Sequence, residues 1–258
     1  MSTFKFGRRH PVAAGPRLAL KNYLLESLPA PPASVNYQHK AAKTLHRVYL
    51  NDTLGDCVIA GMAHLTGVLT ANAGDQFFYS PEQIVALYSA IGGYVPGNPA
   101  TDNGCDELTA LNYWLQNGAP AGSHAIKGYL AVDPSNVTEL QTAIWLFENL
   151  FFALDLPDAW VNPFPSSNGF TWDVAGAPDP SNGHCVIGCG YQADGIVIST
   201  WDMTGLMTNK AVAQYCAGTA DGALYTILSA DLIAAATNKA PNGFDFAQLA
   251  ADFKAIGG

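Results

Sequence analysis

The stretch 51–65 reads Asn51-Asp52-Thr53-Leu54-Gly55-Asp56-Cys57-Val58-Ile59-Ala60-Gly61-Met62-Ala63-His64-Leu65, a polar, glycine-containing loop that leads into an apolar run. From Cys57 onward, apolar residues recur at three- and four-residue spacing, which is typical of a helix with a buried face. Asp56 is a good N-cap residue, so we expect Cys57 in the first helical turn. A thiol in that position faces free backbone amides and the positive end of the helix dipole, and both favour the thiolate. The stretch therefore predicts a nucleophile, although a free cysteine is more often a small buried apolar residue.

The composition favours a soluble globular chain. Of its 258 residues, 49% are apolar and only 13% are charged, which is the reverse of the balance in disordered proteins. No apolar run reaches the length of a membrane span, since the nearest, 143–156, is interrupted by Glu148, Asn149 and Asp155. Residues 1–16 lack the apolar core of a secretory signal. We therefore expect a cytoplasmic protein that does not associate with a membrane.

The cysteine pattern does not indicate a disulfide framework or a metal site. Five cysteines lie at positions 57, 105, 185, 189 and 216, an odd number without close CxxC spacing. Because no export signal precedes them, we expect free thiols. Cys185 and Cys189 lie four residues apart in a strand-like run, roughly 13 Å at strand rise, which does not suit zinc. We predict no metal and no cofactor.

Basic residues are concentrated near the N-terminus. Residues 1–50 hold eight of the twelve Lys and Arg residues but one acid, Glu26, whereas the remainder has four basic and twenty acidic residues. We interpret 1–50 as a basic, Pro-rich arm that lies along its own acidic body. Binding of the arm to nucleic acid or anionic lipid is less favoured, because no Lys/Arg run is long. A further hypothesis is that residues 1–36 act as a propeptide that covers an acidic cleft.

The pattern changes from helical to strand-like near residue 120, which predicts an α+β fold. We expect a helical half at 51–122 that carries the nucleophile, and an antiparallel β half with C-terminal helices at 123–258. Helices are predicted at 57 to about 73, 82–91, 106–116, 137–148, 207–216, 230–237 and 244–256. Strands are predicted at 125–132, 150–156, 184–191, 196–201 and 223–228, with a loop at 157–183.

His184 is the best candidate for the base that a cysteine nucleophile needs. It opens the strand-like run His184-Cys185-Val186-Ile187-Gly188-Cys189-Gly190-Tyr191. His64 shares a helix with Cys57 but lies roughly 10 Å away along the axis, so we expect a core or partly solvated role for it.

A hairpin is predicted between this run and 196–201. If its loop is 193–195, Gln192 pairs with Ile196 and His184 lies opposite Thr204. Asp202 then becomes a diagonal neighbour of His184 on the same face. An acid beside an imidazole fixes its tautomer and stabilises the imidazolium, so Asp202 suits the role of orienting residue.

The order of these motifs resembles that of the papain-like cysteine peptidases, from residue 51 to about residue 228. In that family a Gln lies six residues before the cysteine, and Asn51 holds that position here. The family's Asn-Gly-Gly loop resembles Asp102-Asn103-Gly104-Cys105. Its His-Ala-Val…Gly-Tyr strand resembles His184-Cys185-Val186…Gly190-Tyr191, and its Asn-Ser-Trp-Gly strand end resembles Ser199-Thr200-Trp201-Asp202.

The resemblance implies a papain-like fold, in which a helical N-terminal half packs on an antiparallel β-sheet or barrel half with the active-site cleft between them. It implies that the Asn51 amide and the backbone N–H of Cys57 stabilise an oxyanion. The third catalytic residue is left open between Asp202, Thr200 and Ser199, and Asp202 is favoured because only it is charged. The implied catalytic residues are Cys57, His184, Asp202 and Asn51, and the implied substrate-binding residues are Asn103, Gly104, Cys105 and Trp201.

We therefore expect a cysteine hydrolase that cleaves peptide, amide or ester bonds through a thioester. The alternative is a non-catalytic papain-like module used for binding or assembly. The expected partner is a peptide or a small amide or ester substrate, and the oligomeric state is left open.

Overall fold

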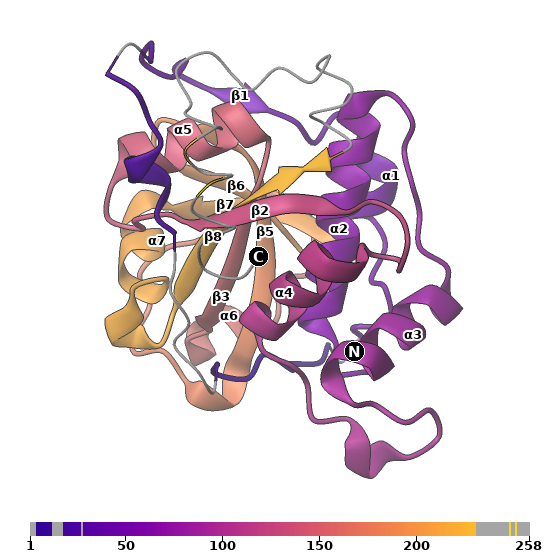
Figure 1. The fold of residues 1–258 in the computed structure, drawn as a ribbon. Helices are drawn as coiled ribbons and strands as arrows, with labels where there is room; N and C mark the ends of the chain where they lie inside the picture. Colours follow the sequence, from indigo (N-terminus) through magenta and orange to yellow (C-terminus); the bar gives the residue numbers. More distant parts are fainter. Residues whose placement is uncertain (1–3, 12–17, 27, 231–247, 249–250, 252–258) are drawn as a thin grey trace.

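Helix α2 (Cys57–Ala73) lies across one face of an eight-stranded sheet, and the remaining elements are arranged around this pair (Figure 1). The computed structural model describes residues 4–11, 18–26, 28–230, 248 and 251. The other α-helices are α1 (Ala42–Leu45), α3 (Pro81–Gly92), α4 (Glu107–Asn117), α5 (Val137–Phe147), α6 (Asp158–Val161) and α7 (Asn209–Tyr215). The strands are β1 (Val35–Asn36), β2 (Ile126–Ala131), β3 (Leu150–Asp155), β4 (Phe170–Trp172), β5 (Gly183–Gln192), β6 (Gly195–Thr200), β7 (Met203–Thr208) and β8 (Ala223–Ser229).

Helix α2 begins and ends where the sequence predicts. It starts at Cys57 and stops at Gly74, whose φ of 110° is the left-handed conformation that terminates a helix. Every residue from Cys57 to Ala71 is buried, so the helix is apolar on all sides because it lies inside the core. Asp56 occupies the predicted N-cap position and Cys57 lies in the first helical turn, although the Asp56 side chain makes no capping hydrogen bond. Among the described residues, no helix has both the length and the apolar character needed to cross a bilayer.

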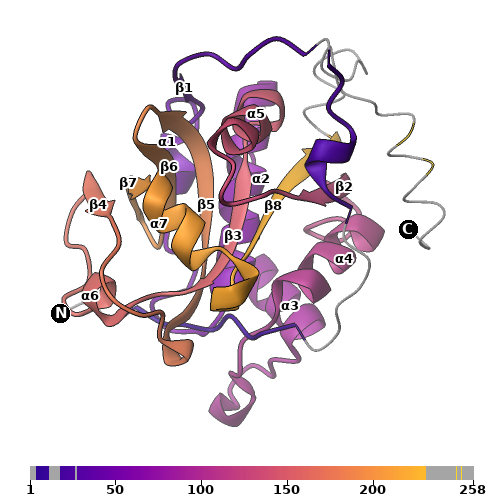
Figure 2. The same ribbon diagram turned by 90° about the vertical axis from the view of Figure 1, so that its left-hand side faces the viewer.

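The sheet has the order β2-β8-β3-β5-β6-β7-β4, and the short β1 pairs with the far end of β5. Its pairs are antiparallel except for β4 with β7, which confirms the predicted α+β class. Both faces are buried, and alternate residues of β3 enter different cores. Phe151 and Ala153 face α2, whereas Leu150, Phe152 and Leu154 pack with α5 and α7. Figure 2 shows α2 and α7 on opposite sides of β3 and β5.

The region after β6 differs from the sequence-based prediction. Instead of a helix at 207–216, the chain forms strand β7 and then the shorter helix α7. The predicted loop at 157–183 contains α6 and β4, and β4 joins the sheet by pairing with β7. Small and polar residues such as Gly205 weaken the alternation that would have identified β7 as a strand. The predicted tail helices, 230–237 and 244–256, lie almost entirely outside the described residues.

His64 has the core role that the sequence favours. It is 2% exposed, and its Nε2 lies 2.7 Å from the carbonyl oxygen of Arg47, to which it donates. Its ring meets that of Tyr49 edge-on, with centroids 5.1 Å apart. Burial lowers the pKa of His64 to about 4, so the imidazole is neutral at physiological pH. His64 thus connects α2 to the loop that precedes the cysteine.

A buried neutral histidine makes stability fall as the pH drops below its unfolded pKa of about 6.5, because the unfolded chain then binds a proton that the folded chain excludes. This part of the stability is fully present above that pH and is lost progressively down to the folded pKa of about 4. We expect the stability difference between the wild type and His64→Gln to shrink by about 2 kcal/mol between pH 7.5 and pH 5.0. Urea denaturation of both proteins at the two pH values measures it. A difference that does not change with pH would contradict the burial of a neutral ring.

Candidate active site

Cys57 lies at the mouth of α2 and is 1% exposed. Burial raises the pKa of its thiol to about 12, while hydrogen bonds from the backbone of Cys185 and Gly7 act in the opposite direction. The sequence predicted a lowered pKa from the helix N-terminus, but exclusion of water outweighs the dipole in this structure. The contact with Cys185 also places the thiol beside the residue that follows His184.

His184 is the second residue of β5 and is 1% exposed. Its Nε2 lies 2.8 Å from Oγ1 of Thr200, and its ring stacks on Trp201 with centroids 4.7 Å apart. Nδ1 has no hydrogen-bond partner within the described part of the chain. Burial lowers the pKa of His184 to about 3, so the ring is neutral. One nitrogen is therefore held in place and the other remains available.

Thr200, rather than Asp202, lies against His184. Gln192 pairs with Gly195 and not with Ile196, so the predicted hairpin register is wrong by one residue. The register shifts again at a bulge between positions 188 and 190. Strand β6 then ends at Thr200, and Asp202 falls in the exposed turn before β7, with its carbonyl 3.2 Å from His46 Nδ1. The predicted diagonal placement of Asp202 beside His184 is therefore wrong.

The remaining alternative for the third residue, Ser199, is fully buried on β6 and pairs with Ile187. Its hydroxyl has no hydrogen-bond partner among the described residues. Of the three alternatives that the sequence left open, Thr200 is the one whose side chain is hydrogen-bonded to the imidazole among the described residues, at 2.8 Å.

The loop before Cys57 is held by its own polar groups. The side-chain amide of Asn51, the predicted oxyanion donor, donates to the carbonyl oxygen of Leu54 at 3.1 Å and is buried. Burial raises the pKa of Asp56 well above its usual range, and the Asn51 side chain opposes this shift. The neutral form of Asp56 is thus favoured, which avoids a buried negative charge next to Cys57.

The loop 102–105 is fastened to the cysteine loop. Oδ1 of Asp102 accepts hydrogen bonds from the backbone N–H of Gly55, at 2.9 Å, and from the hydroxyl of Tyr88, at 2.7 Å. Gly104 has a φ of 72° and donates its N–H to the Tyr88 hydroxyl at 2.7 Å. Through Asp102 and Tyr88, the loop that carries Gly104 and Cys105, two of the predicted substrate-binding residues, is therefore attached to the loop that precedes Cys57. Asn103 is exposed, and its amide donates to the carbonyl of Ala100.

Residues 4–10, here named the covering segment, contact Cys57 and are hydrogen-bonded to both sides of the site. Figure 2 shows the N-terminal part of the chain passing beneath the sheet toward α3. The hydrogen bonds are between backbone atoms, which any sequence of residues can supply. They join the segment to Asn51, Cys105 and Gly183, which come from three separate parts of the chain. The bonds are Lys5 N to Asn51 O (2.9 Å), Gly7 N to Gly183 O (3.2 Å), Arg8 N to Gly183 O (3.0 Å), Cys105 N to Gly7 O (3.0 Å) and Arg9 N to Cys105 O (3.0 Å).

Gly7 lies at the tightest point of the covering segment. A Cβ on Gly7 would collide with the carbonyl oxygen of Gly55, and a Cβ on Gly104 would collide with the carbonyl oxygen of Gly7. A Cβ on Gly183 would meet the carbonyl oxygen of Arg8 at 2.5 Å. Four glycines therefore permit the segment to approach the site at backbone distance, where its backbone also contacts the Cys57 thiol.

Aromatic side chains of the covering segment close the site over His184. Phe4 stacks on Trp201 with centroids 4.6 Å apart, and Phe6 meets the His184 ring edge-on at 5.8 Å. Phe164 contacts both of these phenylalanines, at 5.5 Å and 5.9 Å. This enclosure excludes water from the imidazole and accounts for its lowered pKa.

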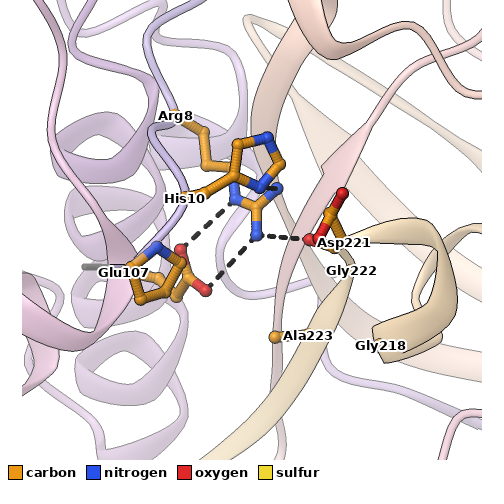
Figure 3. Close-up of a pocket in the computed structure, with 8 residues that line it drawn as sticks. Arg8, His10, Glu107, Gly218, Asp221, Gly222 and Ala223 are labelled. Carbon is orange, nitrogen blue, oxygen red and sulfur yellow. Dashed lines mark hydrogen bonds and ion pairs between the residues drawn. The ribbon is translucent and has the colours of Figure 1, made fainter. Parts of the chain in front are cut away.

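Arg8 projects from the covering segment into a pocket and forms ion pairs there (Figure 3). Its Nε lies 3.3 Å from Oε2 of Glu107, and its Nη1 lies 3.3 Å from Oδ1 of Asp155. Its Nη2 donates to the carbonyl oxygen of Asp221 at 2.6 Å. The side chains of Arg8, Glu107 and Asp155 are only 1%, 0% and 2% exposed. Thus the expectation that the basic N-terminal region lies along an acidic body is confirmed for Arg8.

The arrangement matches that of known structures. Xylellain, a cysteine protease from Xylella fastidiosa, superposes with a TM-score of 0.66 over 88% of this chain and 97% of its own, at 16% sequence identity. Digestive procathepsin L 3 from the larval midgut of Tenebrio molitor gives a TM-score of 0.57 over 82% of this chain and 76% of its own, at 15% identity. The chain has the papain-like fold. A cysteine protease from Carica candamarcensis shares this papain-like fold, with a TM-score of 0.52 over 75% of this chain and 97% of its own, at 17% identity.

Comparison of sequences does not assign the chain to a family. No protein-family model matches the chain, and no curated protein matches it. The papain-like fold is therefore established here by three-dimensional similarity, while the roles of individual residues have to be argued from their own geometry.

Several residues at the site had no signal in the sequence analysis. Arg8, Glu107 and Asp155 come together only in the folded chain, since they lie 99 and 147 positions apart along it. The Gly-Arg-Arg-His stretch at 7–10 adds to the positive charge of residues 1–50 but matches no motif for a site. Phe4 and Phe6 alternate with Lys5 and Gly7, as in an extended segment with one apolar face, and this alternation was the one available clue.

The contact between Thr200 and His184 predicts that Thr200→Val perturbs the imidazole and Asp202→Asn does not. The valine keeps the shape of threonine but leaves the buried Nε2 without its partner, which costs about 1–3 kcal/mol. The exposed Asp202 should contribute less than about 0.5 kcal/mol. Urea denaturation and the ring ¹⁵N chemical shifts of His184 measure both effects. If the ¹⁵N chemical shifts of His184 change in Asp202→Asn and do not change in Thr200→Val, Asp202 is the orienting residue after all.

Proposed function

We propose that this chain is a cysteine hydrolase that cleaves peptide or amide bonds through a thioester, and that its covering segment holds it in a latent state. The proposal rests on one observation: Cys57 begins α2 and His184 lies on β5, a helix and a strand that pack against each other, and both residues lie under the same segment. The papain-like fold of structures described as cysteine proteases supports it.

In the proposed reaction, His184 takes the proton of the Cys57 thiol, and the sulfur attacks the carbonyl carbon of the substrate. The developing oxyanion is stabilised by the backbone N–H of Cys57 and by the Asn51 amide, which must turn away from Leu54 to reach it. The C–N bond then breaks, and the imidazolium gives its proton to the leaving amine. Water, deprotonated by His184, attacks the thioester and releases the acid product and the free thiol. Thr200 holds the imidazole through Nε2, which leaves Nδ1 to exchange these protons.

Latency follows from the electrostatics of the covered site. Burial raises the pKa of Cys57 to about 12 and lowers that of His184 to about 3, so neither carries its reactive charge. When the covering segment leaves, water reaches both groups and the burial penalty falls. The helix N-terminus and the neighbouring imidazole then favour the thiolate. The same chain can therefore be inert with the segment in place and reactive without it.

A non-catalytic module for binding or assembly is the second candidate. It is favoured by a threonine, instead of an acid or an amide, beside His184 and by the engagement of the Asn51 amide within its own loop. In that case, removing the cover would leave Cys57 no more reactive than an ordinary thiol. The experiments below separate the two functions.

Gly7→Val should expose the site. Overpacking a tight position costs about 1–3 kcal/mol, which raises the population with a displaced segment by about 5- to 150-fold. We expect the rate of Cys57 alkylation by iodoacetamide near pH 6 to rise by a similar factor, read by mass spectrometry for each of the five cysteines. Lys5→Ala is the matched control, because the Lys5 side chain is exposed and only its backbone is bonded. Equal rates in both variants would show that the segment does not control access.

In the Gly7→Val protein, we expect hydrolysis of a mixture of internally quenched peptides. Cys57→Ser and His184→Ala, each added to Gly7→Val, should reduce it to background, since nucleophile and base act as one unit. His184→Ala should also abolish the fast alkylation of Cys57. Slow, equal labelling of all five cysteines in Gly7→Val, together with no peptide cleavage, would favour the binding module.

A further inference from the structure

The pocket around Arg8 contains more negative than positive charge. Glu107 is fully buried and Asp155 is 2% exposed, and together they face the single guanidinium of Arg8. His10 lies at the rim, with Nε2 3.5 Å from Asp155, and its ring is 43% exposed. Buried carboxylates are costly unless a cation or hydrogen-bond donors satisfy them. These two acids therefore form a site that requires a cationic occupant.

The occupant is held as a guanidinium and not as a simple point charge. Acceptors reach it on three sides: both carboxylate oxygens of Glu107 face Nε and Nη2, Asp155 faces Nη1, and the carbonyl oxygen of Asp221 accepts from Nη2. This arrangement matches the planar fork of arginine, whereas an ammonium group would leave part of it unsatisfied. Figure 3 shows the Arg8 guanidinium directed between Glu107 and Asp221.

The pocket adjoins the reactive groups and has room for a side chain that enters from a peptide. Arg8 directly follows Gly7, whose backbone contacts the Cys57 thiol, and its own N–H is bonded to Gly183, next to His184. A space of about 200 Å³ opens beside Arg8, bordered by Glu107 and by the segment 218–223. The acids belong to α4 and β3 and not to the covering segment.

We infer that Glu107 and Asp155 select an arginine side chain in the peptide substrate, and that Arg8 fills their pocket in its place while the chain is latent. This inference rests on the proposed function and assigns its substrate class: peptides with an arginine near the cleaved bond. Glu107 and Asp155 are then specificity-determining residues, and the covering segment competes with the substrate through the same charge contact.

Binding is tested without catalysis in the full-length Arg8→Ala protein. We expect ethylguanidinium at millimolar concentration to raise its melting temperature, and n-pentylammonium, which has the same number of non-hydrogen atoms, to raise it less. The rescue should disappear in Arg8→Ala/Glu107→Gln, where one buried acceptor charge is gone. Equal effects of the two ions, or rescue that survives the second substitution, would overturn the inference. Should Arg8→Ala not fold, the melting temperature of Arg8→Lys is compared with that of the wild type: the lysine keeps a charge for the two acids but lacks the planar fork, so we expect a lower melting temperature, and an unchanged one would overturn the inference.

Selectivity is tested with the full-length Gly7→Val protein and peptides that differ only in one residue near the scissile bond. We expect cleavage of the arginine peptide to exceed that of the lysine peptide by on the order of tenfold. It should exceed that of the norleucine peptide by about 10²-fold or more, because the norleucine leaves buried acceptors unpaired. Asp155→Asn should reduce both preferences, because one of the two acceptor charges is then gone.

The two proposals fail in distinguishable ways. Cleavage without preference for arginine would refute the pocket assignment and leave the hydrolase intact. Guanidinium rescue without cleavage of any peptide would refute the hydrolase and leave an arginine-binding pocket.

Discussion

The close contact between α2 and β5 is the constraint on which the site depends. A Cβ on Gly61 would lie 2.9 Å from the ring of Phe151 and 3.0 Å from the sulfur of Cys185, so only glycine permits this distance between helix and sheet. Cys57 lies one helical turn before Gly61, and His184 lies one residue before Cys185. The distance between α2 and β5 therefore determines where the Cys57 thiol and the His184 imidazole lie, independently of the conformation of the surrounding loops.

Many helices and strands of the fold are determined by residues close together in the sequence, which explains why the sequence predicts them. The start of α2 at Cys57 follows from a polar loop that meets an apolar run, and its end at Gly74 follows from the need for a left-handed residue. The continuous apolar run 150–154 identifies β3 as a strand buried on both faces. Strand β7 was missed because its identity comes from pairing with β6 and not from its own residues. Such pairing is invisible to a window of neighbouring residues.

At the candidate site, the sequence identifies the cysteine and the histidine that lie under the covering segment, but not the geometry that supports them. Cys57 and His184 are marked by their positions at the start of a helix and of a strand. The neighbour of His184 was misjudged, because a one-residue change in hairpin register and a bulge at 188–190 moved Asp202 away and brought Thr200 close. A register shift of one residue turns side chains to the other face, so counting along the chain cannot replace coordinates.

The sequence marks the covering segment only by its positive charge and by the alternation of Phe4 and Phe6, whereas the contacts that would maintain the proposed latent state are long-range. Each backbone hydrogen bond contributes about 0.5–1.5 kcal/mol, whereas breaking a buried ion pair by removing one partner costs about 3–5 kcal/mol. Arg8 therefore cannot leave its pocket alone, because Glu107 and Asp155 would remain buried and unpaired. When the covering segment is displaced, either water must reach both acids or another cation must replace Arg8. The backbone groups of Cys105 and Gly183 must also find new hydrogen-bond partners. A peptide that supplies both kinds of contact can exchange with the segment at little net cost, and a ligand that supplies only one cannot.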